Sequence, residues 1–307
     1  MKHDHRENLE QHSPMTGGIW GVLAFLIWGL SPLYWKQLRN VPAFEILMHR
    51  MVWSFVFLVP VLLLQRRWNQ FLFALKERRT LIPLTCSTLL VGCNWFIYIW
   101  AINHDHVLQT SLGYFITPLV NMLLGMIFLN ERLRPAQWVS VALVAGSVSF
   151  LTIRGGQFPW IALALAVSFG FYGLIRKITP VSALAGLCVE TFLMTIPALC
   201  YLCYLCYLDM TSTGAIFRLS VSTDLLLMGT ALVTAFPLLM FTLSARRVRL
   251  CTLGFLQYIA PSCTFVLGAF YFHEPISGEQ IWSFGLIWTG LLIYSVHSAI
   301  ACKGLKQ

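Results

Sequence analysis

The chain has 307 residues, of which 58% are hydrophobic and only 11% are charged, and its mean hydropathy is +0.73. A water-soluble domain carries roughly 25% charged residues, so this composition excludes a protein whose whole surface faces water. The formal net charge of +9 would suit a nucleic-acid partner, but the positions of the basic residues, described below, argue against one.

Ten apolar stretches follow one another along the chain, each close to the ~20 residues that a helix needs to cross a bilayer. They cover residues 17–36, 43–64, 80–102, 107–129, 135–153, 158–176, 182–208, 223–243, 251–272 and 279–300. The segments between them are mostly short, so neighbouring helices are expected to pack antiparallel. The predicted fold class is therefore an all-α integral membrane protein with ten transmembrane helices.

The basic residues alternate between the two sides of these spans. If the polar segment 1–16 is cytoplasmic, most of the 21 Lys and Arg residues fall on the cytoplasmic side, as the positive-inside rule requires. The same count places the tail 301–307 in the cytoplasm. The basic charge thus signals membrane topology, and no nucleic-acid partner is expected.

An internal repeat relates the two halves of the chain. Five residue types in the first half recur in the second at a constant offset of 143 residues. They are Pro118, Gly125, Phe128, Glu131 and Gln137, matched by Pro261, Gly268, Tyr271, Glu274 and Gln280. The predicted repeats are residues 17–153 and 158–300, each with five spans.

An odd number of spans in each repeat means that the second repeat enters the membrane from the opposite side. Inverted repeats of this kind place a binding site near the midplane and allow alternating access. A purely structural duplication is the alternative. Glu131 and Glu274 lie at span ends, where they are expected to cap helices or bind local basic groups.

Two charged residues lie well inside predicted spans. Arg50 and Glu190 are each about eight residues into a span, or ~12 Å deep at 1.5 Å per residue. A charge at that depth must face protein or water. One hypothesis is that Glu190 takes up protons or a cationic substrate while Arg50 holds an anionic group or pairs with Glu190. The alternative is a static ion pair that sets helix packing.

Polar and aromatic residues also gather on single faces of three spans, where lipid offers polar atoms no partner. Residues spaced by three or four positions share a helix face. The predicted substrate-binding residues are Arg50, Asn94, Trp95, Tyr98, Tyr114, Asn121, Glu190, Gln257 and Tyr258. Packing between helices is the alternative for several of them. Trp20, Trp28, Trp35 and Trp282 are instead read mainly as interfacial anchors, with Trp28 a weaker candidate for the site.

No cofactor or metal is expected. The nine cysteines lie almost entirely in apolar stretches, where they behave as small hydrophobic residues. Cys200, Cys203 and Cys206 are spaced as in an iron–sulfur motif, but a continuous apolar helix cannot wrap around a cluster.

Three segments carry a family resemblance. They are NWFIYIWAINHDHVLQTSLGYFITPLVNMLLGMIFLNERL (94–133), EILMHRMVWS (45–54), and TLGFLQYIAPS with FHEP (252–275). They resemble the RarD proteins, named for chloramphenicol sensitivity, of the EamA group in the drug/metabolite transporter superfamily. The resemblance implies a ten-span permease of the bacterial inner membrane with a 5+5 inverted repeat. It names no substrate, since related proteins move amino acids, nucleotide sugars, purines or cationic drugs. One departure is His104-Asp105-His106, where the family pattern has a sequence like Asn-Gly-Arg.

The sequence thus predicts a secondary transporter of a small organic metabolite or drug, expected to be an exporter coupled to protons or to exchange. Membrane lipids and a small-molecule substrate are the other expected partners. The chain contains no GxxxxGK[ST] phosphate-binding motif, and no enzymatic activity is expected. The alternative is an integral membrane enzyme that acts on a lipid-soluble substrate.

Overall fold

The computed structural model describes residues 14–103, 107–133, 135–154, 159–209 and 221–271, with residues 278, 281–282, 285–290, 292–294 and 296. Every regular element in this part of the chain is helical. The elements are α2 (Pro14–Leu30), α3 (Pro32–Trp35), η1 (Lys36–Leu38), α4 (Ala43–Leu64), α5 (Trp68–Lys76), α6 (Arg78–Asn103), α7 (Val107–Leu129), α8 (Pro135–Arg154), α9 (Trp160–Ile178), α10 (Ala183–Asp209), α11 (Val221–Arg247), α12 (Leu250–Gln257), α13 (Ile259–Val266) and η2 (Leu267–Tyr271).

Six helices of the described chain are long and apolar enough to cross a membrane. They cover Pro14–Leu38, Ala43–Leu64, Arg78–Tyr98, Trp160–Ile178, Ala183–Leu205 and Val221–Arg247. Shorter apolar helices fall within the other four predicted spans, at Gly113–Leu129, Gln137–Phe150, Leu250–Val266 and Gly285–Tyr294. The all-helical membrane fold is confirmed, whereas the count of ten spans and the division into repeats stay predictions.

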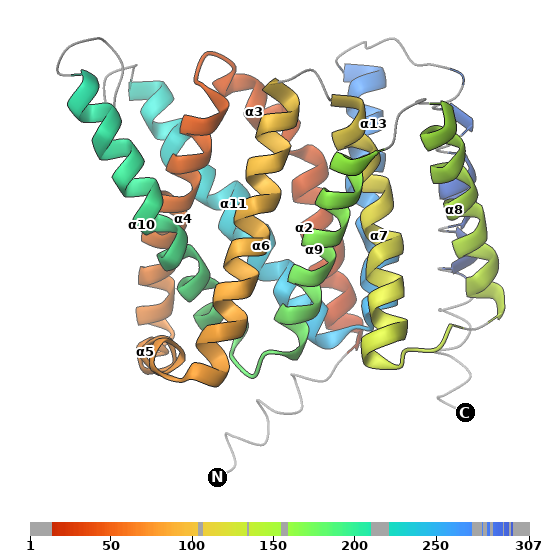
Figure 1. Ribbon diagram of the computed structural model, residues 1–307, viewed down its shortest axis with the longest axis horizontal. Helices are drawn as coiled ribbons and strands as arrows, with labels where there is room; N and C mark the ends of the chain where they lie inside the picture. The colour runs from red at the N-terminus through yellow and green to blue at the C-terminus, as the bar shows by residue number, and fades with distance from the viewer. Residues whose placement is uncertain are drawn as a thin grey trace.

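The long helices stand side by side, and many spatial neighbours are distant in sequence (Figure 1). Helix α4 packs against α10, α7 packs against α9 and α12, and α11 packs against α2 and α4. The pairs α4 with α10 and α7 with α12 each join corresponding spans of the two predicted repeats. The two halves of the chain are therefore interleaved rather than separate.

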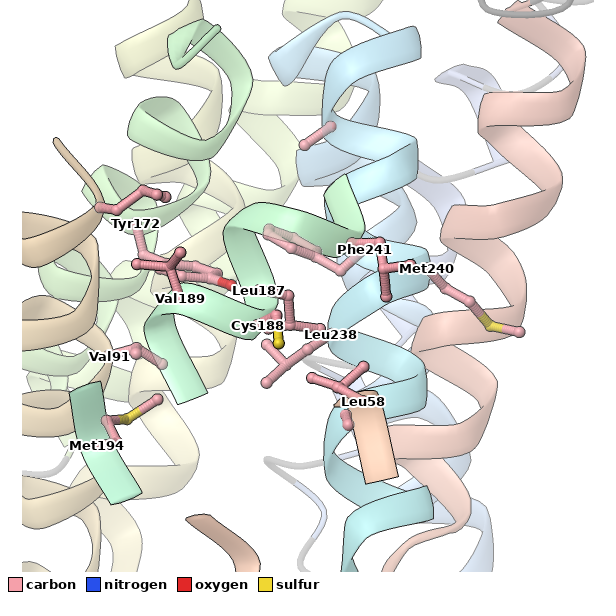
Figure 2. Packing of buried hydrophobic residues seen from close by; sticks show 14 of the residues in the cluster. Leu58, Val91, Tyr172, Leu187, Cys188, Val189, Met194, Leu238, Met240 and Phe241 are labelled. Atoms are coloured by element: carbon pink, nitrogen blue, oxygen red, sulfur yellow. The ribbon is translucent and has the colours of Figure 1, made fainter. Parts of the chain in front are cut away.

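Apolar side chains lie both inside the bundle and on its outside. Leu58, Leu238 and Phe241 are among the buried residues of the largest core cluster, which brings α4, α10 and α11 together (Figure 2). Many large apolar residues are also exposed, including Leu64, Ile127 and Phe270. Extensive exposed apolar surface is typical of a protein that faces lipid.

Two segments differ from the predicted spans. The first span does not run unbroken to Lys36, because α2 ends at Leu30 and a separate short helix starts at Pro32. Ser31 donates a 2.7 Å hydrogen bond to the Trp28 carbonyl, and proline occupies the first turn of α3. The ninth span is divided at Tyr258 into α12 and α13 and continues as a π-helical turn at 267–271.

One element was not predicted. Helix α5 lies in the segment between the second and third predicted spans and buries Phe71 and Ala74 against the bundle. It appears end-on in Figure 1, so it crosses the upright helices at a steep angle. With nine residues, and polar ones such as Asn69 and Lys76 among them, this helix lacks the sequence pattern of a membrane span.

A glycine on α12 permits close contact with α7. A Cβ atom at Gly254 would lie 2.6 Å from the Pro118 carbonyl oxygen, whereas a Cβ at Gly92 on α6 would meet nothing within 4 Å. Gly254→Ala is therefore expected to lower the free energy of unfolding by about 1–3 kcal/mol, the usual cost of overpacking. Gly92→Ala, the matched control, should be neutral or slightly stabilising. Thermal unfolding of both variants in detergent tests this, and an unchanged midpoint for Gly254→Ala would contradict it.

Candidate functional site

Arg50 lies on α4 with its guanidinium framed by two tryptophans. The guanidinium carbon is 4.9 Å from the ring centroid of Trp35 and 4.9 Å from that of Trp95. The Nε atom donates a 2.9 Å hydrogen bond to Thr234 Oγ1 on α11. Cation–π contacts and this hydrogen bond offset part of the cost of placing a charge deep in a bundle.

Two tyrosines join the same group. The rings of Tyr98 on α6 and Tyr114 on α7 meet edge-on with centroids 6.0 Å apart. Their side chains are also hydrogen-bonded to each other, and both lie close enough to Arg50 for electrostatic interaction. Tyr114 is 52% exposed, although its helix packs against α6, α9 and α12. The bundle therefore does not completely enclose this group at Tyr114.

The structure thus brings four of the predicted residues together, namely Arg50, Trp95, Tyr98 and Tyr114. It adds Trp35 and Thr234, which the sequence did not single out for this site. Trp35 was interpreted mainly as an interfacial anchor, and a threonine in an apolar helix carries no special signal. We call these six residues the Arg50 site.

Glu190 belongs to a different, sealed cluster. Both Glu190 on α10 and Arg176 on α9 have fully buried side chains, and Arg176 Nε lies 3.6 Å from Glu190 Oε1. Ser87 on α6 donates to the same carboxylate oxygen, and the Tyr172 hydroxyl donates to the other over 3.4 Å. This ion pair is embedded in the apolar core around Tyr172, Leu187 and Val189 (Figure 2).

This cluster corrects two expectations. The ion-pair partner of Glu190 among the described residues is Arg176, so the hypothesis that Arg50 pairs with Glu190 is wrong. Arg176 is one of the basic residues that the positive-inside pattern places at the cytoplasmic ends of the spans, but its side chain is completely buried. The chain makes room for it with Gly186, where a Cβ would lie 2.2 Å from the Arg176 Nη1 atom.

The four remaining predicted residues join helices to one another. Asn94 donates to the Leu165 carbonyl at 2.8 Å and to Ser168 at 2.9 Å, which ties α6 to α9. Tyr258 donates to the Phe115 carbonyl at 3.0 Å. No hydrogen bond or ion pair connects any of these four with Arg50 in the described part of the chain.

The other two form a buried amide pair. Asn121 on α7 donates to the Gln257 side chain on α12, and both residues are buried. The Asn121 Oδ1 atom is buried without a hydrogen-bond partner among the described residues. This pair lies between corresponding spans of the two predicted repeats.

A second polar group holds the junction between α11 and α12. Glu131 follows Asn130, whose positive φ of 51° ends α7, and its carboxylate accepts 2.7 and 2.9 Å hydrogen bonds from the amides of Leu250 and Cys251. Arg249 lies 4.0 Å from the same carboxylate. The expectation that Glu131 caps a helix and binds a basic group is confirmed. Its counterpart Glu274 lies outside the described residues.

Lys177 holds the other side of this junction. Its Nζ donates a 2.9 Å hydrogen bond to the Ala245 carbonyl and another to the Val248 carbonyl, at the end of α11. A cation at a helix C-terminus and a carboxylate at an N-terminus both complement the helix dipole. We call Glu131, Lys177 and segment 245–251 the junction clasp.

Comparisons with known proteins agree with this architecture. The model of the EamA-like transporter family matches residues 15–153. The chain is 44% identical to Protein RarD of Salmonella typhi over 91% of this chain and 94% of that protein. An uncharacterized transporter of Vibrio cholerae is 44% identical over 97% and 98% of the respective chains. The chain belongs to the RarD family.

Members of this family, within the EamA-like transporters, are multi-pass membrane transporters, and this chain is one of them. A solved crystal structure described only as that of a protein covers 92% of this chain and 98% of its own, with a TM-score of 0.70 and 20% identity. That similarity shows the fold alone.

Proposed function

We propose that this RarD-family protein is a secondary transporter that carries a small organic molecule across the bacterial inner membrane, with its substrate site centred on Arg50. The observation that carries the proposal is a guanidinium that lacks an ion-pair partner among the described residues and is framed by aromatic side chains from α3, α6 and α7. A small number of precisely placed polar groups among aromatic side chains is typical of small-molecule binding sites.

Comparison with the buried ion pair of Arg176 and Glu190 supports Arg50 as the centre of the substrate site. Arg176 and Glu190 neutralise each other and are shut off from solvent, so they have no free charge to offer a substrate. Arg50, in contrast, has no ion-pair partner among the described residues. Proton uptake by Glu190 stays a hypothesis, and the surroundings of the carboxylate favour the alternative of a static ion pair.

The relation between α7 and α12 supports alternating access. Tyr258 bonds to Phe115, and these residues are 143 residues apart, which is also the offset of the sequence repeat. Two repeat-related residues touch each other only where they straddle the pseudo-two-fold axis. Inverted repeats move by exchanging conformations about such an axis.

In this exchange of conformations, the junction clasp is the contact that would open and close. The offset of 143 maps Glu131 onto Glu274, and maps Leu250 and Cys251 onto Val107 and Leu108 at the start of α7. In the proposed cycle, Glu131 closes the cytoplasmic end in one state.

Proteoliposomes test the proposal directly. A thermal-shift screen of metabolites and drugs on detergent-purified protein identifies a ligand, and counterflow of that ligand into protein-containing vesicles is the expected result. A pH gradient, applied and withheld, separates proton coupling from exchange. Chemical turnover of the ligand without movement would favour the alternative of a membrane enzyme and overturn the proposal.

The junction clasp also yields a prediction. Glu131→Gln keeps the shape of the side chain but removes the charge that two amides and Arg249 share, so stability should fall by about 0.5–2 kcal/mol, as on loss of a helix cap. The counterflow rate should change with it. Glu77→Gln is the matched control, because Glu77 accepts one 3.3 Å bond from the Arg79 amide on the surface. Equal behaviour of the two variants in unfolding and counterflow would contradict the assigned role of Glu131.

A further inference from the structure

The Arg50 site carries a positive charge with no negative partner among the described residues. Arg176 pairs with Glu190 and Arg249 pairs with Glu131, and neither pair includes Arg50. The groups close to the Arg50 guanidinium are two indole rings, one threonine hydroxyl and two neutral phenols. In a bundle surrounded by lipid, an unpaired cation is costly, and an anionic ligand would remove that cost.

Part of the Arg50 guanidinium already has partners in the protein, and the edge formed by its two terminal nitrogens does not. Its Nε donates to Thr234, and the tryptophan rings lie against the guanidinium carbon. Neither terminal nitrogen donates a hydrogen bond within the described chain. Two parallel terminal N–H groups match the two oxygens of a carboxylate.

The single positive charge of Arg50 limits the kinds of ligand that the site can bind. A single guanidinium balances one negative charge, so a monoanion fits better than a phosphate dianion. An amino acid would also bring an ammonium group, and the described carboxylates near the bundle centre offer it no partner, because Glu190 is held by Arg176. The surrounding rings of Trp35, Trp95, Tyr98 and Tyr114 suit a flat apolar body.

We infer that the Arg50 site binds a monoanionic organic acid, with its carboxylate on the terminal nitrogens of Arg50 and its aromatic or apolar body against the surrounding rings. This inference rests on the proposed function and names the substrate class of the same site. It has a consequence for direction. A membrane potential that is negative inside pulls an anion outward, so export needs no coupling ion.

A matched set of compounds tests the ligand class. The probes are 3-phenylpropanoate, its neutral amide 3-phenylpropanamide, the cation 2-phenylethylamine, and phenyl phosphate, each measured for binding to the full-length protein by thermal shift and for counterflow. The carboxylate is expected to bind at least about 30-fold more tightly than the amide, as when one partner of a desolvated charge pair is removed. Arg50→Gln should abolish this preference, and Glu77→Gln, an exposed position between α5 and α6, should keep it.

Flux driven by potential gives a second readout. In vesicles loaded with 3-phenylpropanoate, a potassium diffusion potential set with valinomycin should drive the acid toward the positive side, about tenfold per 59 mV at equilibrium for one charge. Flux that ignores the potential would overturn the electrogenic step.

The outcomes separate the inference from the function on which it rests. Counterflow of the amine or the amide at the rate of the acid, preference for phenyl phosphate, or no binding of the acid overturns the monoanion inference. If one of these other compounds is exchanged across the membrane, the proposal that the protein is a transporter still holds. Binding without movement in either assay would count against transport itself.

Discussion

Glu190→Gln is expected to lower the free energy of unfolding by about 3–5 kcal/mol, the usual cost of leaving one partner of a buried ion pair uncompensated. The Arg176 side chain is completely buried, so water cannot replace the lost charge. Its remaining bond in this region is a 3.0 Å contact with the Ala183 carbonyl. Arg176→Met should cost a similar amount, because it leaves Glu190 unpaired.

The double variant Arg176→Met with Glu190→Leu should recover most of that loss. Replacing both members of a buried pair with apolar residues of similar volume is often neutral. The neighbouring hydroxyls keep partners, because Ser87 also donates to the Leu84 carbonyl at 3.0 Å and Tyr172 is hydrogen-bonded to Thr242. Additive losses in the double variant, measured by unfolding in detergent, would contradict a pairwise interaction.

The same variants decide between the two interpretations of Glu190. If the ion pair is static, the double variant should retain counterflow and its pH dependence. If Glu190 carries protons, the double variant should fold but lose proton coupling. Single variants alone cannot answer this, because their instability would lower activity in either case.

The fold class could be predicted from the sequence because it depends on properties that are averaged over many residues. Hydrophobicity, the spacing of apolar stretches and the alternation of basic residues are all local. Helix α5 escaped because its nine residues are too short for a span, and the division at Tyr258 escaped because the stretch 251–272 has the length of one continuous span.

The site was only partly predictable, for a different reason. Polar residues such as Arg50, Asn94 and Tyr258 stand out in apolar helices, and the sequence shows that each must find a partner. It does not show whether that partner is a ligand or another helix. Asn94 and Tyr258 use backbone carbonyls of the protein, whereas Arg50 keeps free donors. Trp35 and Thr234 reach Arg50 from α3 and α11, which is a tertiary approach that no local pattern reveals.

Arg176 shows the limit of counting charges by position. It lies near the C-terminal end of α9, where the positive-inside rule treats an arginine as a loop charge. The side chain instead points into the bundle, toward α10 and the space left by Gly186. The sequence signal for this burial is Gly186, four residues before Glu190 on the next helix.

Arg50→Gln is expected to reduce counterflow by about 100-fold or more while the protein remains folded. Loss of a desolvated charged contact to a ligand typically costs 2–5 kcal/mol, which corresponds to roughly 30- to 4,000-fold in affinity. The glutamine can still bond to Thr234, and no carboxylate of the described chain loses an ion-pair partner. Stability should therefore change much less than in Glu190→Gln, in contrast to the sealed pair.

Arg50→Lys separates charge from shape at the same position. Lysine keeps the positive charge but has neither the planar fork that grips two oxygens nor a flat face for Trp35 and Trp95. We expect it to retain some counterflow, between that of the wild type and that of Arg50→Gln, with weaker ligand binding. Wild-type counterflow in Arg50→Gln would show that the guanidinium only supports helix packing. Equal loss in Arg50→Lys and Arg50→Gln would show that its geometry, rather than its charge, governs transport.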